Sequence, residues 1–341
     1  MKEISIIGVD LAKRVFQVHG IDAEHKTVVQ KKLPRSEVLK WFAEQGPCLV
    51  GMEACATAHY WAREISKLGH EVRIIPPSYV KPYVRRQKNN RADAAAICEA
   101  VSRPEMRFTT IKTIEQQAVQ TLHRSRELLV RQYTQTGNAV RAHLSEFGWI
   151  FPQGNEGLSQ AIAIVQTTTD ADLPELVRTV LGSLVAQLTY LKQAIGRLDK
   201  QMVAWHKSQV ENLRLATIPG IGPVTASAIL SAIGDGKQFK SGREFAAWVG
   251  LVPRQNSSGG KESLGHITKR GNMYIRRLLV SGATTQLRGK RQQNAPGGQW
   301  FEDLLRRKPA RVATVALANK LARITWAVLT KGERYRAPGA L

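Results

Sequence analysis

The sequence has few cysteines, no long apolar run and a shortage of acidic residues. Its three cysteines, Cys48, Cys55 and Cys98, lack metal-ligand spacing and are odd in number, which favours ordinary reduced thiols over a disulfide framework or a zinc site. No uninterrupted run of about 18 apolar residues is present, which predicts no membrane span. The N-terminus becomes polar too soon for a signal peptide. We therefore expect a cytoplasmic protein.

The shortage of acidic residues leaves a large positive charge. The chain has 50 Lys and Arg against 27 Asp and Glu, a net charge of +23. Residues 211–341 carry 22 basic against 7 acidic residues, an excess of +15, whereas residues 111–210 carry an excess of only +2. Such a surface repels itself unless a polyanion neutralises it and releases counterions. The composition thus favours a nucleic-acid-binding protein over a merely soluble basic one.

The first 108 residues show the pattern of an α/β domain. Strand-like segments at 4–9, 15–20 and 27–33 precede a helix, a strand, a helix, a strand and a helix, at 36–45, 48–52, 57–68, 71–75 and 90–101. Three strands followed by alternating helices and strands is the element order of an RNase H-like, or RuvC-like, fold. We therefore expect a RuvC-like domain over residues 1–108.

The middle of the chain, residues 109–210, is predicted to be helical. Apolar residues recur at helical spacing over 115–147, and a heptad seam runs from Val177 to Met202. A seam of about four heptads favours a coiled coil. The seam does not fix the partner, which is either an antiparallel helix of the same chain or a second chain. We expect an oligomerisation region here, followed over residues 211–341 by a mainly helical C-terminal domain.

Three carboxylates occupy positions suited to a metal site. Asp10 follows the first predicted strand, Glu53 follows the fourth, and Asp93 lies in the first turn of a helix. In an RNase H-like sheet these strands are neighbours and the helix crosses them, so the three oxygen ligands would converge on Mg²⁺. Taken alone, each residue fits a cap or a solvated charge, and pairing with the helix dipole would explain Asp93.

A helix-hairpin-helix pattern begins the C-terminal domain. Gly220 and Gly222 flank Ile221 and permit a tight turn, and Pro223 suits the first turn of the next helix. Backbone N–H groups over 220–224, at a helix N-terminus, suit one nucleic-acid phosphate. A purely structural hairpin is the alternative.

A glycine-rich loop carries two serines, Ser257 and Ser258. Basic residues bound and follow it: Arg254, Lys261, Lys269, Arg270, Arg276 and Arg277. Cations around an exposed hydroxyl would favour its alkoxide and stabilise a pentavalent phosphorane. A plain flexible linker has the same composition, and the residues alone do not choose between the two.

Together these motifs resemble one family. They are Gly8-Val-Asp-Leu-Ala-Lys13, Met52-Glu-Ala-Cys55, Lys88–Ile97, Ile218-Pro-Gly-Ile-Gly-Pro223, Gly250-Leu-Val-Pro253, Ser257-Ser-Gly-Gly260 and Ile267-Thr-Lys-Arg-Gly-Asn272. Jointly, and over nearly the whole chain, they resemble insertion-sequence transposases of the IS110 family, in the IS1111 branch. These proteins pair a DEDD-type RuvC-like domain with a C-terminal serine transposase domain.

The resemblance implies a bacterial, nucleoid-associated recombinase that excises and integrates its own DNA element. It implies serine-mediated strand exchange, Mg²⁺, a structured bridge RNA that pairs with donor and target DNA, and a dimer-of-dimers tetramer with active sites shared by two protomers. Asp10, Glu53 and Asp93 match three of the family's acidic positions, and Ser258 matches its serine, with Ser257 the weaker match. The remaining acidic position falls on Asn90, whose amide oxygen can still bind Mg²⁺ but lacks a charge.

Two other functions fit the same residues. A RuvC-like nuclease or junction resolvase would use water as the nucleophile and leave free 5′-phosphates, with the serine loop only binding backbone. A catalytically impaired RNA- or DNA-binding protein, favoured by Asn90, would bind tightly without cleavage.

Overall fold

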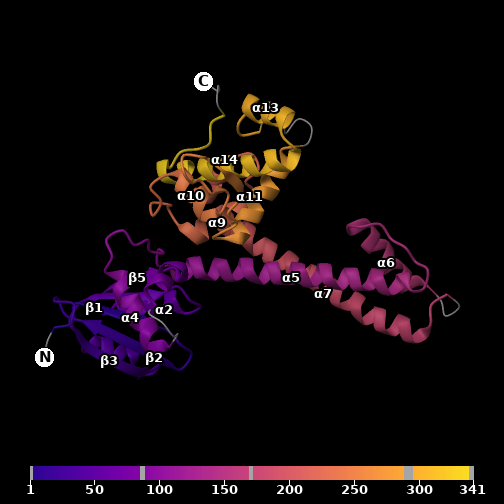
Figure 1. The fold of residues 1–341 in the computed structure, drawn as a ribbon. Coiled ribbons are helices and arrows are strands. Elements are labelled where there is room, and N and C mark those ends of the chain that lie inside the picture. Colours follow the sequence, from indigo (N-terminus) through magenta and orange to yellow (C-terminus); the bar gives the residue numbers. More distant parts are fainter. Residues whose placement is uncertain (1–2, 85–88, 169–171, 288–294, 338–341) are drawn as a thin grey trace. The chain divides into compact units, whose positions relative to one another are not determined.

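The computed structural model describes residues 3–84, 89–168, 172–287 and 295–337 (Figure 1). Lys88, which opens one of the family motifs, lies outside these residues. The chain forms two compact units, Met1–Thr113 and Ile114–Leu341. The helical middle belongs to the second unit, because its long helices pack against a helix of the C-terminal part.

The first unit is built on a five-stranded mixed sheet. Its strands are β1 (Ile6–Asp10), β2 (Val15–Ile21), β3 (Thr27–Pro34), β4 (Leu49–Glu53) and β5 (Glu71–Ile75). They lie in the order β3-β2-β1-β4-β5. The pairs β1–β2 and β2–β3 are antiparallel, and β1–β4 and β4–β5 are parallel. The mixed α/β unit predicted from the sequence is confirmed. Asp10 and Glu53, however, are the last residues of their strands rather than the residues after them.

Side chains alternate between the two faces of this sheet, and each face has its own helices. Ile7 and Val9 belong to the core cluster that includes α1 (Val38–Ala43) and α2 (Ala58–Ser66). The opposite face carries α4 (Asn90–Val101), while α3 (Pro77–Val80) and the 3-10 helix η1 (Lys81–Tyr83) follow β5. Gly8 of β1 lets α4 approach, because a Cβ there would lie 2.2 Å from the Ala94 carbonyl oxygen.

The second unit begins with a helical hairpin. Helices α5 (Ile114–Ser145) and α7 (Glu175–Ser208) pack along each other, and α6 (Asn155–Thr167) packs against both (Figure 1). Leu181 and Leu188 of the heptad seam are buried in a cluster with Val140 and Leu144 of α5. The seam is therefore covered largely from within the chain, as in the intrachain alternative.

The C-terminal part is mainly helical, as predicted. Its elements are α8 (Val210–Leu215), α9 (Pro223–Ile233), α10 (Gly242–Val249), β6 (Pro253–Gln255), β7 (Leu264–Ile267), α11 (Met273–Thr285), α13 (Gln299–Arg307) and α14 (Ala310–Lys331). Within the described residues, α14 has the length and apolarity of a membrane-crossing helix. Its buried residues Leu317 and Leu321 nevertheless lie in one core cluster with Phe245 and Leu279. It is therefore the central helix of this core.

Candidate active site

Asp10 and Glu53 end neighbouring parallel strands of the sheet. The register Val9 to Met52 places them at adjacent positions on β1 and β4. Because side chains alternate along a strand, Asp10 lies on the same face as Gly8, and Glu53 on the same face as Gly51. A Cβ on either glycine would meet α4. Both carboxylates therefore lie on the α4 side of the sheet.

The first turn of α4 brings further oxygen and nitrogen groups to this face. Asn90 lines a cavity of about 620 Å³ together with Asn89 and Arg91 and with three side chains of β2 and β3, Gln17, Gln30 and Lys32. The Arg91 guanidinium donates a hydrogen bond to Gln30 Oε1. Asn89 is the N-cap, since its Oδ1 accepts from the Ala92 N–H at 2.8 Å. Capping thus does not account for Asp93.

The donor chemistry of this face suits a hard divalent cation. Carboxylate and amide oxygens are what Mg²⁺ takes in proteins, with the remaining positions filled by water or substrate. Among the described residues, however, no three His, Cys, Asp or Glu side chains form a group that could hold a metal as it stands. Asp10 and Glu53 lie on adjacent strands, and the participation of Asp93 and Asn90 stays a prediction.

The two serines lie at the tip of a short β-hairpin formed by β6 and β7. The Ser257 hydroxyl accepts a hydrogen bond from the Ser263 N–H at 3.2 Å. The Ser258 carbonyl accepts from the Lys261 N–H at 3.1 Å, which closes the turn. Ser258 is exposed, and its hydroxyl makes no hydrogen bond within the described part of the chain. Both serines are exposed, so they differ in hydrogen bonding: the Ser257 hydroxyl is bound within the loop, and the Ser258 hydroxyl is not.

Sequence reasoning did not predict this hairpin. Its strands are short and largely exposed, and they lack the alternation of apolar and polar residues that marks a half-buried strand. The turn depends on Gly259 and Gly260, whose φ angles of 55° and 77° are left-handed and favour glycine. The glycine-rich loop therefore has a defined turn geometry, rather than that of a plain linker.

The six predicted phosphate-binding cations divide into two groups. Arg254, Lys261, Lys269 and Arg270 are exposed on the hairpin and the loop after it. Arg276 instead donates to the backbone carbonyls of Val249, at 2.8 Å, and Arg270, at 3.0 Å. The guanidinium of Arg277 lies 2.9 Å from Glu127 of α5.

Arg276 therefore ties α11 to the end of α10, whereas Arg277 is itself exposed and forms a surface ion pair with α5. A role in binding nucleic acid stays a prediction for all six cations.

The helix-hairpin-helix pattern has fewer backbone N–H groups available to a phosphate than the sequence predicts. Gly222 is the N-cap of α9 and is exposed. Gly220 packs against α11, where a Cβ would lie 2.9 Å from the Gly282 carbonyl oxygen. The Ile221 N–H donates to the Ile218 carbonyl at 2.9 Å, and Pro223 has no N–H. Among the predicted donors over 220–224, the Ile221 N–H is therefore used within the turn. Gly220 is in contact with α11.

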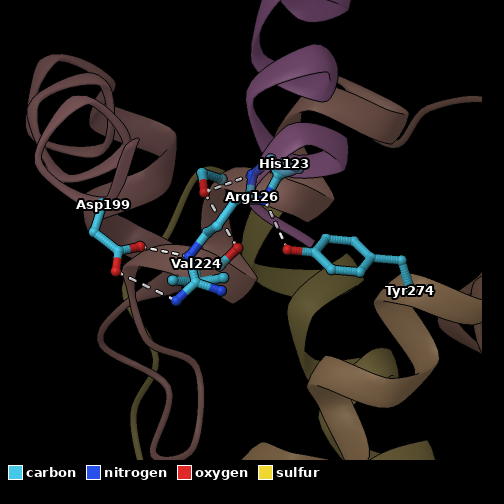
Figure 2. A network of polar contacts seen from close by, with 6 residues as sticks. His123, Arg126, Asp199, Val224 and Tyr274 are labelled. Atoms are coloured by element: carbon cyan, nitrogen blue, oxygen red, sulfur yellow. Dashed lines mark hydrogen bonds and ion pairs between the residues drawn. The ribbon is translucent and has the colours of Figure 1, made fainter. Parts of the chain in front are cut away.

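A partly buried polar network that sequence reasoning missed links the helices of the second unit (Figure 2). His123 of α5 contacts the Tyr274 hydroxyl of α11 and the Ser227 hydroxyl of α9, each at 3.0 Å. Ser227 donates to the Val224 carbonyl, so its oxygen accepts from Nε2–H of a neutral His123. One turn along α5, the Arg126 guanidinium binds the carboxylate of Asp199 on α7. A single histidine at a helix position gives no sequence signal for such a role.

This network predicts acid sensitivity. Burial, with help from Arg126, lowers the pKa of His123 from 6.5 to about 4. Above pH about 6.5 the imidazole is neutral in both the folded and the unfolded chain; as the pH falls toward 4, only the unfolded chain takes up the proton. We expect the second unit to lose on the order of 3 kcal/mol of stability over this range. Urea unfolding at a series of pH values measures the loss.

The variant His123→Gln is the control for that experiment. It keeps polar groups in the network but does not titrate, so its stability should fall less over the same range. Comparing the two chains separates His123 from His206, whose pKa is also lowered by burial. Equal pH dependence in both chains would show that His123 is not responsible.

Comparisons with known proteins match this architecture. A DEDD-type IS110 transposase family model matches residues 7–149, and a model described as "Transposase IS116/IS110/IS902 family" matches residues 212–296. A "Probable family 20 transposase" of Pseudomonas aeruginosa is 48% identical over 98% of this chain and 99% of its own length.

Two further relatives are named for insertion sequences. The transposase for insertion sequence element IS1328 of Yersinia enterocolitica is 40% identical over 97% of this chain and 98% of its own length. The transposase for insertion sequence element IS1111A of Coxiella burnetii is 39% identical over 98% of this chain and 92% of its own length. Similarity at this level over the whole length establishes that the chain belongs to the IS110 family of transposases.

Proposed function

We propose that this transposase breaks and rejoins DNA with Ser258 as its nucleophile. The observation that carries the proposal is the difference between the two serines of the hairpin. Both serines are exposed, but the Ser257 hydroxyl accepts from the Ser263 N–H, whereas the Ser258 hydroxyl has no partner in the described chain. Arg254 and Lys261 lie on the same hairpin and are exposed. A nucleophile must be accessible, and a phosphoryl-transfer transition state needs cations close by.

The reaction follows from the chemistry of a serine hydroxyl. Ser258 Oγ loses its proton and attacks a DNA phosphorus, and the bond from phosphorus to the 3′-oxygen breaks. The products are a 5′-phosphoserine and a free 3′-hydroxyl. A 3′-hydroxyl then attacks the phosphoserine, so one phosphodiester replaces another and no ATP is consumed.

The first unit would supply the metal site of the proposed function. We assign it an RNase H-like fold, supported by the strand order β3-β2-β1-β4-β5 with the parallel and antiparallel pairs described above. Asp10 and Glu53 would hold Mg²⁺, with Asp93 and Asn90 contributing from α4. When bound, the ion would neutralise charge on the phosphate oxygens. Within a tetramer, two protomers would share each site.

Restoring a fourth carboxylate should strengthen metal binding. Asn90→Asp adds one negative charge to the α4 side of the sheet, and Mg²⁺ affinity rises with ligand charge. We expect the variant to reach half-maximal strand cleavage at roughly a tenfold lower Mg²⁺ concentration, since this corresponds to about 1.4 kcal/mol. A Mg²⁺ titration of cleavage measures the change, and Gln45→Glu, which adds a carboxylate just after α1 on the opposite side of the sheet, is the control. An unchanged requirement would remove Asn90 from the proposed ligand set.

DNA is the substrate that membership of the family implies, and further partners are part of the proposal. A structured guide RNA, assembly as a tetramer, a place in the IS1111 branch and association with the bacterial nucleoid rest on the resemblance. Exposed apolar residues on one face of α7, Leu176, Val180 and Tyr190, support self-association. Sequencing the nucleic acid that copurifies with the protein tests the guide, because one discrete RNA is expected.

A denaturing gel with labelled donor DNA tests the nucleophile. Wild type and Ser257→Ala should form a covalent protein–DNA adduct, and Ser258→Ala should form none. An adduct from Ser258→Ala would overturn the assignment. Free 5′-phosphate products without an adduct would instead identify a water-using nuclease, and tight binding without cleavage in Mg²⁺ would identify an impaired binding protein.

A further inference from the structure

A groove of about 1500 Å³ runs along the outer side of α14 in the second unit. Its floor is apolar and is formed by α14 residues that include Val312, Val315, Ala316 and Ile324. One wall comes from the strands of the serine hairpin, through Pro253 and Ile267. Of the residues named above for nucleic-acid binding, only Lys269 lines this groove.

The groove accounts for apolar residues of α14 that the core does not fully bury. Residues such as Leu317 and Leu321 are fully buried in the core. Val315 and Ala316, on another side of the helix, are only half-buried and line the groove. The helix therefore has apolar side chains that pack against the core only in part and leave some of their surface in the groove.

The rim of the groove is positively charged. Its cations are Arg243, Lys269, Arg311, Lys320 and Arg323, and the described residues that line it include no Asp or Glu. Trp300 of α13 also lines it and is 39% exposed. The Lys320 ammonium lies 4.5 Å from the centroid of the Trp300 ring. The ammonium lies over the ring and covers part of one face, so a base would stack on the remaining exposed surface of the indole, next to a phosphate-binding charge.

We propose that this groove binds unpaired nucleotides of a DNA strand, with a base stacked on Trp300 and phosphates along the cationic rim. Aromatic side chains in a basic groove are the general means of binding single strands, because every base has a π face. An apolar peptide would leave the five cations without partners. A duplex keeps its bases stacked inside, and so has no base face to place on Trp300 or the apolar floor.

The lining favours DNA over RNA. The Asn319 amide donates to the Leu251 carbonyl at 3.2 Å, and the Trp326 indole donates to the Gly236 carbonyl at 3.1 Å. The indole N–H of Trp326 and one of the two amide N–H groups of Asn319 are thus used within the chain, which leaves fewer donors on the floor for a 2′-hydroxyl, the group by which proteins distinguish RNA. The inference rests on the proposed function in one respect: a strand opened near Ser258 would supply the unpaired nucleotides, since the serine hairpin forms one wall.

Binding of a fluorescently labelled 12-nucleotide single strand to the full-length protein tests the proposal. The measurement is made in EDTA, so no cleavage contributes, and it is repeated with the duplex and with RNA of the same sequence. Removing one base–aromatic stack by Trp300→Ala should weaken single-strand binding by roughly fivefold to a hundredfold. Trp300→Phe keeps a stacking ring and should restore most of the affinity. Duplex binding should change little in either variant.

A charge variant gives a second readout. Lys320→Met keeps an apolar stem over Trp300 but removes the cation, and should reduce the salt dependence of single-strand binding by about 0.7 in the log–log slope. Lys331→Met, at the end of the same helix and outside the groove, should leave affinity and slope nearly unchanged. Crosslinking from a 5-iododeoxyuridine strand should label Trp300.

Several results would overturn the groove proposal. They are unchanged single-strand affinity in Trp300→Ala, an equal loss for duplex, tighter binding of RNA than of DNA, or a crosslink outside the groove. The Ser258→Ala protein should give the same binding curve as wild type, so failure of the serine mechanism would not affect this assay. Conversely, intact adduct formation by a protein whose groove does not bind would reject the groove alone.

Discussion

Replacing Asp10 with Asn is expected to reduce strand cleavage by about a hundredfold to a thousandfold, the range seen when one group that stabilises transition-state charge is removed. The carboxylate ends β1 on the face that carries α4, next to Glu53 on β4. The substitution keeps the size of the side chain but removes its charge, so the proposed ion would be held more weakly. Cleavage rates on labelled donor DNA at saturating Mg²⁺ measure the effect.

Glu44→Gln, at the C-terminal end of α1, is the matched control because it removes one carboxylate from the same unit. Its cleavage rate should equal that of wild type. DNA binding should be preserved in both variants, since most of the positive charge lies after residue 210. Full cleavage by Asp10→Asn would exclude this carboxylate from the reaction, and with it the proposed metal site.

Gly8→Ala is expected to destabilise the first unit by about 3 kcal/mol, as overpacking against rigid backbone does. A Cβ at this position would lie 2.2 Å from the Ala94 carbonyl oxygen and 2.4 Å from the Cys98 nitrogen. Neither atom belongs to a flexible side chain, so α4 must move away from the sheet. Hydrogen exchange of the α4 amides in the full-length protein measures the loss.

Gly46→Ala provides the comparison within the same unit. A Cβ there meets nothing within 4 Å, so its effect should stay within about 0.5 kcal/mol. Because α4 carries Asp93 and Asn90, Gly8→Ala should also reduce cleavage while Gly46→Ala does not. Equal exchange of α4 in both variants would mean that the close approach of α4 to β1 does not exist in solution.

The secondary structure of the first unit was largely predictable. The bounds of α4 and β5 agree with the prediction, and the other strands agree within two residues. The reason is local: buried strands bounded by polar turns, and a helix beginning at an Asn cap, leave a clear pattern in the sequence. The register of β1 against β4, which places Asp10 beside Glu53, depends on pairing between distant segments and had to come from the structure.

The features that the sequence did not reveal depend on tertiary contacts. The heptad seam of α7 looked the same for either partner, and only the packing against Val140 and Leu144 identified one within the chain. Arg276 looked like a phosphate ligand but binds backbone carbonyls. The sequence did not reveal the groove. Apolar residues of α14 predict burial, but they do not show which of them the other helices cover. The sequence likewise did not identify Trp300 as a binding residue, because a single tryptophan in a helix is equally explained by packing.

The central claim is that Ser258 becomes covalently attached to DNA. Mass spectrometry tests it most directly: the protein is reacted with donor DNA and Mg²⁺, trapped in denaturant, digested with nuclease and protease, and its peptides are sequenced. The account predicts a nucleotide remnant on Ser258 in the hairpin peptide, and none on Ser257. A remnant on Ser257 or on any other residue, or cleaved DNA with no modified peptide, would contradict it.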